Sequence, residues 1–179
     1  MHKIHFLIIL PILMATLNNI IFDFNSNSDV SKWRVVDDVV MGGRSNGNFK
    51  LNKDGFGEYT GKISLENNGG FSSLRYRFEE KQIEGFSKVI LKIKGDGKKY
   101  QFRIKKDSND YHSYISSFST NGDWQTIEIN LSGMYPAFRG RVLDMENLSS
   151  DSIEEVAFLI GNKKEENFTL LIDKISLDK

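Results

Sequence analysis

The stretch from Lys88 to Lys106, "KVILKIKGDGKKYQFRIKK", decides the fold class of this chain. On either side of its Gly-Asp-Gly turn, every second residue is apolar, which is the period of a strand with one face buried. These apolar residues are Val89, Leu91, Ile93, Tyr100, Phe102 and Ile104. The turn lacks the G-x-x-x-x-G-K-[ST] pattern of a phosphate loop. We therefore predict two strands joined as a tight hairpin.

Similar runs lie on both sides of this stretch. Alternating or continuously apolar segments are "IIFDF" (20–24), "GNFKLN" (47–52), "GEYTGKIS" (57–64), "TIEINLS" (126–132), "SIEEVAFLIG" (152–161) and "FTLLIDKISL" (168–177). Gly, Asn and Asp clusters separate them, and no long amphipathic helix interrupts them. The pattern predicts about ten strands in two antiparallel sheets, with fewer than about a tenth of residues helical. The expected fold is an all-β jelly-roll β-sandwich.

The composition limits the chemistry that the chain can perform. It has 179 residues, 24 lysines and arginines against 24 aspartates and glutamates, three histidines and no cysteine. The balanced charge gives no reason to expect a nucleic acid partner, which requires concentrated positive charge. Without cysteine there is no disulfide, thiolate zinc site or cysteine nucleophile, and three histidines leave little for metal ligation. We therefore expect neither a metal nor a cofactor.

The N-terminus reads "MHKIHFLIILPILMATL", with an apolar run from Phe6 to Leu17 that only Pro11 and Thr16 interrupt. This run has the length of the apolar part of a signal peptide and is too short to span a membrane. We predict that residues 1–18 are a leader for export to the periplasm or beyond, cleaved near residues 18–20, and that residues 19–179 form one domain. The alternative is a buried N-terminal segment of a cytoplasmic protein. An uncleaved leader would be the route to membrane contact.

The motif "WRVVDDVVMGGRSNG" (33–47) combines a large aromatic residue, two adjacent carboxylates and a glycine pair. Adjacent side chains on an extended segment point to opposite faces, so Asp37 and Asp38 are not expected to act as an acid–base pair. We expect one of them to accept hydrogen bonds from backbone N–H groups of the glycine turn. The motif is therefore interpreted as a structural corner, made by Trp33, Asp37, Asp38, Met41, Gly42, Gly43 and Ser45.

Five motifs follow one another as "DDVVMGGRS" (37–45), "LENNGGFSSLR" (65–75), "GDGKKYQFRI" (95–104), "WQTIEI" (124–129) and "MYPAFRGR" (134–141). With them, the chain resembles the complex I intermediate-associated protein family, the thirty-kilodalton assembly-factor class, from about Ile21 to Leu177. The resemblance implies a galactose-binding-like β-jelly roll, transient association with assembly intermediates of respiratory complex I, and no known enzymatic activity. Mitochondrial members carry a matrix-targeting presequence, whereas residues 1–18 have the character of an export leader.

A basic face is predicted on two of the strands. If Leu74 and Tyr76 face the core, the arginines between and beyond them face the other way. The basic residues of this predicted face are Arg75, Arg77, Arg103 and Lys105, beside Ser73 and Gln101. A guanidinium group binds carboxylate or phosphate through two parallel hydrogen bonds, so the face suits an acidic sugar or an acidic protein patch. The alternative is a solvated sheet face. We expect Arg75 to pair with Asp96 or another carboxylate, and Arg77 to remain near solvent and bind the partner.

Aromatic residues and one loop supply further candidates. Exposed rings stack on sugars or anchor protein interfaces, and the candidates are Tyr111, His112, Tyr114 and Trp124. We nevertheless expect both Trp33 and Trp124 to pack largely under loops or between the sheets. In "MYPAFRGR", we expect Arg139 to hold the loop to a carboxylate such as Asp37, Asp38 or Asp96, and Arg141 to face the partner.

The residues predict a non-catalytic binding module that recognises a protein, and the family resemblance implies an assembly or chaperone-like role for it. The alternative is a jelly roll that binds a glycan. Glycoside hydrolysis would need two carboxylates, but the candidates Asp37, Asp38, Glu66 and Asp96 have no diagnostic spacing. The predicted partner-binding residues are Asn67, Asn68, Arg77, Arg103, Tyr111, Tyr114 and Arg141. The predicted structural residues are those of the corner together with Gly69, Gly70, Phe71, Arg75, Gly95, Asp96, Gly97, Trp124, Arg139 and Gly140. The expected partner is a protein, such as an assembly intermediate of a respiratory complex, or a glycan.

Overall fold

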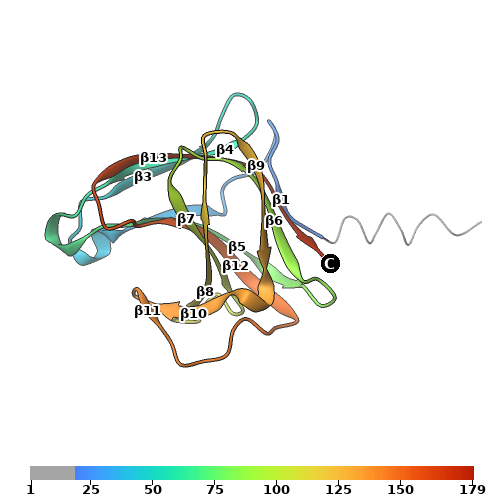
Figure 1. Ribbon diagram of the computed structural model, residues 1–179. Coiled ribbons are helices and arrows are strands. Elements are labelled where there is room, and N and C mark those ends of the chain that lie inside the picture. The colour runs from blue at the N-terminus through green and yellow to red at the C-terminus, as the bar shows by residue number, and fades with distance from the viewer. Residues whose placement is uncertain (1–18) are drawn as a thin grey trace, which may run out of the picture.

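The computed structural model describes residues 19–179 and is built almost entirely from strands (Figure 1). Its elements are β1 (Ile20–Asp23), β2 (Trp33–Asp37), η1 (Asp38–Met41), β3 (Asn46–Leu51), β4 (Gly57–Ile63), η2 (Glu66–Asn68), β5 (Ser72–Gln82), β6 (Lys88–Lys94), β7 (Lys99–Lys105), β8 (Ser113–Ser119), β9 (Trp124–Asn130), η3 (Leu131–Gly133), β10 (Tyr135–Phe138), β11 (Arg141–Val142), β12 (Ser152–Ile160) and β13 (Glu166–Asp178). Within these residues, the helical elements are three short 3-10 turns, η1, η2 and η3. None of the described helices is long and apolar enough to cross a membrane. The leader predicted at residues 1–18 lies outside the described residues.

The strands form two antiparallel sheets that face each other (Figure 1). Sheet A has the order β3-β4-β13-β6-β9, with β1 also paired to β13. Sheet B has the order β11-β10-β8-β7-β12-β5-β2. Both orders join strands that are distant in the sequence, which is typical of a jelly roll. The predicted all-β jelly-roll sandwich is confirmed, with 13 strands in residues 19–179 instead of the expected ten or so.

The core lies between the two sheets and is filled from both by the alternating apolar residues. Leu91 and Ile93 of β6 are fully buried, as are Phe102 of β7 and Phe158 of β12. On the sheet B side, the ring of Trp33 stacks on that of Tyr76, with 4.8 Å between ring centroids. Burial of this many apolar side chains is the main source of stability in such a fold.

The two tryptophans differ in their environments. Trp33 is buried, as expected. Trp124, however, is 40% exposed and packs its ring against Phe56, with 4.7 Å between centroids. It lies opposite Lys94 at the start of β9, whereas the next residue, Gln125, lies opposite the buried Ile93. The prediction that Trp124 is largely buried is therefore wrong, because the alternation of β9 turns it to the outer face of sheet A.

The turn from Gly95 to Lys98 does not close a hairpin. Strand β6 belongs to sheet A and β7 to sheet B, so this turn carries the chain from one sheet to the other. Asp96 holds the crossing: its carboxylate accepts hydrogen bonds from Lys98 Nζ (2.6 Å), Tyr100 Oη (2.9 Å) and the Thr169 backbone N–H (2.9 Å). The hairpin prediction is wrong, and so is the expected pairing of Arg75 with Asp96, whose hydrogen-bonding partners lie in the turn itself, on β7 and on β13.

The two glycine-rich motifs meet at Asp38, at the end of the sandwich drawn on the left of Figure 1. Asp38 is 1% exposed, and its carboxylate accepts hydrogen bonds from Ser45 N–H (3.0 Å), Ser45 Oγ (2.6 Å), Gly70 N–H (2.5 Å) and Phe71 N–H (3.3 Å). A Cβ atom on Gly43 would lie 2.3 Å from Asp38 Cγ, so glycine alone fits there. We call this arrangement the Asp38 corner. It confirms that one of the two adjacent aspartates accepts backbone hydrogen bonds.

Asp37 also accepts hydrogen bonds at this end of the sandwich, on the opposite face of the chain from Asp38. Its carboxylate accepts hydrogen bonds from Gly47 N–H (2.9 Å) and Ser72 Oγ (2.5 Å). Tyr59 in turn donates to Ser72 Oγ at 2.7 Å. Because Asp37 ends β2 and Ser72 begins β5, this contact joins the two strands where their pairing starts.

Candidate functional site

Sheet B carries six cationic side chains on or beside its outer face, and we call this surface the basic face. Its members are Lys32, Arg34, Arg75, Arg77, Arg103 and Lys105. Strand register brings most of them close together. Arg34 lies opposite Arg75, while Arg75 and Arg103 flank Ala157 of β12. Two register steps along, Arg77 and Lys105 flank Glu155.

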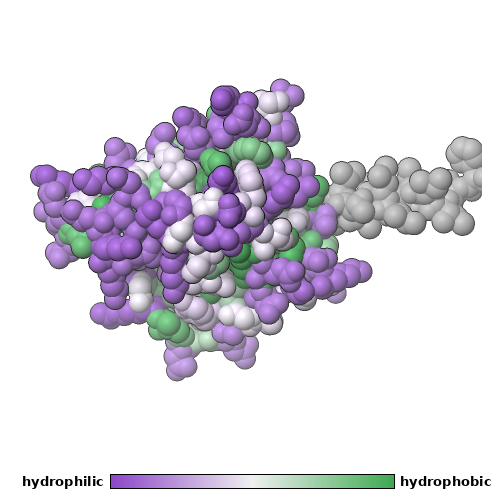
Figure 2. Space-filling model, turned by 45° about the horizontal axis from the view of Figure 1, so that its top comes forward, coloured by the Kyte–Doolittle hydropathy of each residue, from purple (hydrophilic) through white to green (hydrophobic). Residues whose placement is uncertain are grey.

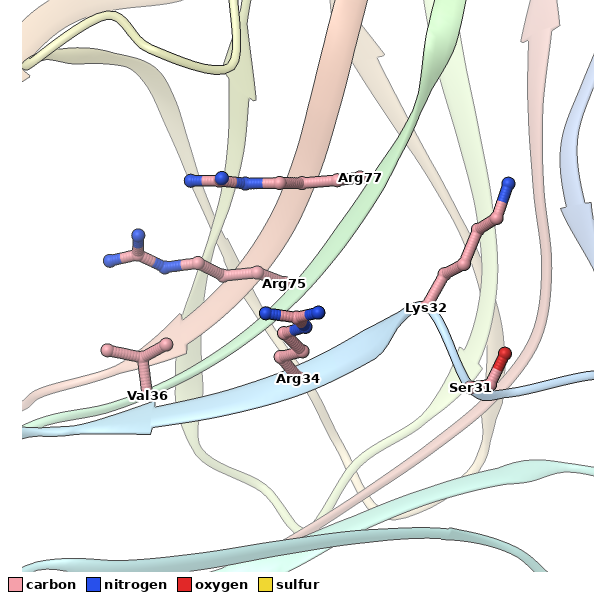
Figure 3. Close-up of a pocket in the computed structure, with 6 residues that line it drawn as sticks. All are labelled: Ser31, Lys32, Arg34, Val36, Arg75 and Arg77. Atoms are coloured by element: carbon pink, nitrogen blue, oxygen red, sulfur yellow. The ribbon is translucent and has the colours of Figure 1, made fainter.

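A pocket, which we call the groove between β2 and β5, lies over these two paired strands, among their outward side chains (Figure 3). Its volume is about 340 Å³, and it is lined by Ser31, Lys32, Arg34, Val36, Arg75 and Arg77. In Figure 3, Arg75 and Arg77 extend in the same direction from β5, and Arg34 rises from the neighbouring β2. Four of the six lining residues are therefore cations. The view in Figure 2 shows mainly hydrophilic residues, with hydrophobic ones in small separate patches.

Glu155 is the carboxylate that compensates part of this charge. It is 3% exposed and accepts a hydrogen bond from Arg77 Nε at 2.6 Å. Arg103 donates instead to the side chain of Gln101, and Lys105 donates to the backbone carbonyl of Asp110. Among the described residues, the side chains of Lys32, Arg34 and Arg75 make neither a hydrogen bond nor an ion pair. The basic face therefore holds more positive charge than its own carboxylate neutralises.

The pKa values of the two more buried cations, Arg103 and Lys105, agree with this excess of positive charge. Burial lowers the pKa of Arg103 to about 10, and repulsion from Arg75 adds to the effect. Burial also lowers the pKa of Lys105, where Arg75 and Arg77 act in the same direction and Glu155 opposes them. These shifts mean that the cations are close enough to destabilise one another's charged forms. An anion bound here would relieve that repulsion.

The predicted partner-binding residues lie at several places. Arg77 and Arg103 are on the basic face. Asn67 and Asn68 are exposed beside the Asp38 corner, where both have positive φ (55° and 59°) and Asn67 Nδ2 donates to the Gly42 carbonyl at 2.9 Å. Arg141 is exposed on β11, at the edge of sheet B opposite to β2.

The aromatic candidates in the segment 111–114 separate into one exposed ring and two buried rings. Tyr111 is 63% exposed and packs edge-on against Phe138, with 5.2 Å between centroids. Tyr114 is 3% exposed and belongs to the core cluster, so the expectation that its ring is available for stacking is wrong. His112, the third candidate in this segment, is also buried. Tyr114 and the core residue Ile104 lie opposite each other in the β7–β8 pairing, which explains its burial.

Arg139 does not hold its loop to an aspartate. Its guanidinium lies over the ring of Phe138, 5.2 Å from the centroid, and the residue is exposed with φ of 48°. The carboxylates of Asp37, Asp38 and Asp96 are occupied by the hydrogen bonds described above. The predicted pinning contact is therefore wrong, because these three carboxylates each serve a turn near their own strand.

Three members of this site were not among the predicted site residues: Lys32, Arg34 and Glu155. Arg34 was recognisable in principle, since it alternates with Trp33 and Val35 as Arg75 does with Leu74 and Tyr76. Glu155 was not predicted because it lies in the run "SIEEVAFLIG". The apolar character of this run indicates a strand buried on both faces and gives no signal of a charged site. The part of the chain that the structure describes contains no group of three or more His, Asp or Glu residues able to hold a metal ion.

Comparison with known proteins gives two kinds of similarity. The family model described as Complex I intermediate-associated protein 30 (CIA30) matches residues 22–172. A relative from Mus musculus, named "Complex I intermediate-associated protein 30, mitochondrial", is 26% identical over 88% of this chain and 55% of its own length. The chain thus spans about 55% of the length of that relative.

The structural similarities include carbohydrate-binding modules and an agarase. A family 11 carbohydrate-binding module from Clostridium thermocellum, solved with a β-1,3-1,4-mixed-linked tetrasaccharide, has a TM-score of 0.66 and 20% identity, covering 89% of this chain and 94% of that one. An exo-β-agarase has a TM-score of 0.59 and 14% identity over 89% of this chain and 25% of its own. At these identities, the likeness establishes the fold alone.

Proposed function

Because the chain belongs to the complex I intermediate-associated protein 30 family, we propose that it is a non-catalytic binding module with an assembly-factor-like role. In this proposal, the basic face of sheet B holds an acidic surface of a partner protein. The observation that carries the proposal is the uncompensated charge of that face: Arg34 and Arg75 lie directly opposite each other, and neither has a carboxylate partner among the described residues.

The energetics of this arrangement favour a ligand. Like charges placed opposite each other on neighbouring strands destabilise a sheet by an amount on the order of 0.2–1 kcal/mol. Arginine is also the side chain best suited to bind a carboxylate or phosphate through paired hydrogen bonds. A face that is unfavourable for the free protein and complementary to an anion is typical of a binding surface.

A non-catalytic role is supported by the positions of the carboxylates considered for hydrolysis. Asp37, Asp38 and Asp96 accept hydrogen bonds from turns and strands, as described above. Glu66 lies at the surface, paired with Arg44 at 2.9 Å. Each of these carboxylates therefore has a structural explanation, and the family and fold relatives fit a binding protein.

We propose that the partner is a protein engaged in assembly of a respiratory complex. The name of the mouse relative supports this, but the chain corresponds to about 55% of that relative. The mouse relative is named as mitochondrial, whereas the composition of residues 1–18 favours export. We propose cleavage of that leader near residues 18–20. The intact mass of the protein from its native host checks this, and retention of Met1 would contradict it.

A glycan partner is the second candidate, and the groove limits it to an acidic glycan. Neutral sugars are usually held by stacking on exposed aromatic rings. Among the described residues, the groove lining includes no aromatic side chain. The exposed rings of Tyr111 and Trp124 belong to other parts of the surface. An anionic sugar would instead use the same arginines as an acidic protein.

The proposal is tested by partner capture from the native host with the wild-type protein and two charge-matched double variants. Arg34→Gln with Arg75→Gln removes two charges from the groove. Lys88→Gln with Lys92→Gln removes two from sheet A and is the control. We expect capture to be lost for the first and retained for the second, with both folded by circular dichroism. Equal capture by both would refute the proposal, and binding of acidic glycans in place of any protein would favour the second candidate.

A further inference from the structure

We infer that the groove between β2 and β5 binds two oxyanions placed one after the other along the strands. The ligand that presents them is an extended segment of the partner protein with acidic side chains at positions i and i+2. This inference rests on the proposed function and specifies the ligand of the same site.

The cations that line the groove form two rungs. The first rung is Arg34 and Arg75, which the β2–β5 register places opposite each other. The second rung is Arg77, which lies two residues after Arg75 on β5; in Figure 3 these two side chains extend in the same direction, and Lys32, which directly precedes β2, extends away from them. All four residues line the groove. Because Arg75 and Arg77 are two residues apart on β5, they share one face, and the rungs are about 7 Å apart.

Each rung has hydrogen-bond donors to offer. Within the described residues, the side chains of Lys32, Arg34 and Arg75 make no hydrogen bond or ion pair. Arg77 donates its Nε–H to Glu155 of β12, on the side of β5 away from β2, and its two terminal nitrogen atoms make no hydrogen bond among the described residues. Glu155 is buried and thus acts as a positioning residue that fixes the direction of Arg77. A guanidinium group has five N–H donors, so one bond to Glu155 does not exhaust it.

The spacing and the size of the groove favour an extended ligand. Side chains at i and i+2 of an extended chain lie on one face about 7 Å apart, which matches the separation of the rungs. Acidic residues at i and i+4 of a helix have a similar spacing, but a helix with its side chains is about 10 Å wide. A groove of about 340 Å³ is small for such a helix. A strand-like segment places both carboxylates within reach of both rungs.

The test uses fluorescence anisotropy at low salt with labelled Ser/Gly peptides of identical length and composition, each with two glutamates. The glutamates are at i and i+2, at i and i+1, or at i and i+4. We expect the first peptide to bind wild-type protein about fivefold more tightly than the others. We expect Arg34→Gln and Arg75→Gln each to weaken it about tenfold, and Lys92→Gln on sheet A to have little effect.

The outcomes separate this inference from the proposed function. If all three peptides bind equally and Arg75→Gln weakens them all, the spacing is wrong while an anion-binding face remains. If inorganic phosphate competes as well as the i, i+2 peptide at the same concentration, the groove is a simple anion site and the inference is overturned. Failure of every peptide to bind also overturns it. The proposed function is refuted by a separate result: the double variant Arg34→Gln with Arg75→Gln captures the partner as well as the wild-type protein does.

Discussion

Replacing Asp38 by alanine removes the central acceptor of the corner and should destabilise the protein strongly. The carboxylate accepts four hydrogen bonds, two from Ser45 and one each from Gly70 and Phe71. Hydrogen bonds to a charged group contribute about 1.5–3 kcal/mol each, but those of one group are not additive. Each buried donor that is left without an acceptor costs about 1–3 kcal/mol. We take about 4 kcal/mol as the expected loss, which lowers Tm by about 8–16 °C in a protein of this size.

The assay is thermal and urea unfolding of the wild type, Asp38→Ala and Asp37→Ala, monitored by circular dichroism. Asp37 is the matched control because it is adjacent and half-buried, and it accepts two hydrogen bonds where Asp38 accepts four. We expect the Asp37 variant to lose about half as much free energy of unfolding. A loss below about 1 kcal/mol for Asp38→Ala, or a larger loss for Asp37→Ala, would refute the role given to the Asp38 corner.

Two further predictions concern pH and charge. Burial raises the pKa of both Asp38 and Asp96, but their hydrogen bonds outweigh it and leave the pKa of each below its usual value. Their stabilising contribution is therefore complete above the unfolded pKa of about 3.9 and is lost as the pH falls through the folded values, so melts should show a steep acid loss that is smaller in Asp38→Ala. Arg75→Gln should raise Tm by about 1–2 °C at low salt and less at high salt, because it removes repulsion from Arg34. A lower Tm at low salt would mean that Arg75 has a stabilising partner.

The fold could be predicted from sequence because its main signals are local. Alternation in β6 and β7 identified two strands, and the continuous apolar run of β12 identified a buried one. The partner of each strand is not a local property, which is why the turn at Gly95–Lys98 was interpreted as a hairpin and not as a crossing between sheets. Side-chain period gives the face of a residue, but it does not identify the neighbouring strand.

The site could be predicted in part for the same reason. Period two placed Arg75 and Arg77 on one face correctly, but their roles depended on which carboxylate lay across the sheet. Arg77 has the buried partner, Glu155, and Arg75 has none among the described residues. Arg34, which completes the first rung, was missed because β2 was considered as part of the glycine-rich corner motif and not as a strand beside β5.

The glycine-rich motifs and the basic face are parts of one arrangement. Asp38 directly follows β2, and the N–H groups that it accepts from Gly70 and Phe71 directly precede β5. The corner therefore fixes the end of one strand against the start of the next, where Asp37 lies opposite Ser72. Three register steps further along, the same pairing places Arg34 opposite Arg75. A slip of one residue would turn one of these arginines toward the core. The rigid corner thus holds two mutually repelling cations in the register that the groove requires.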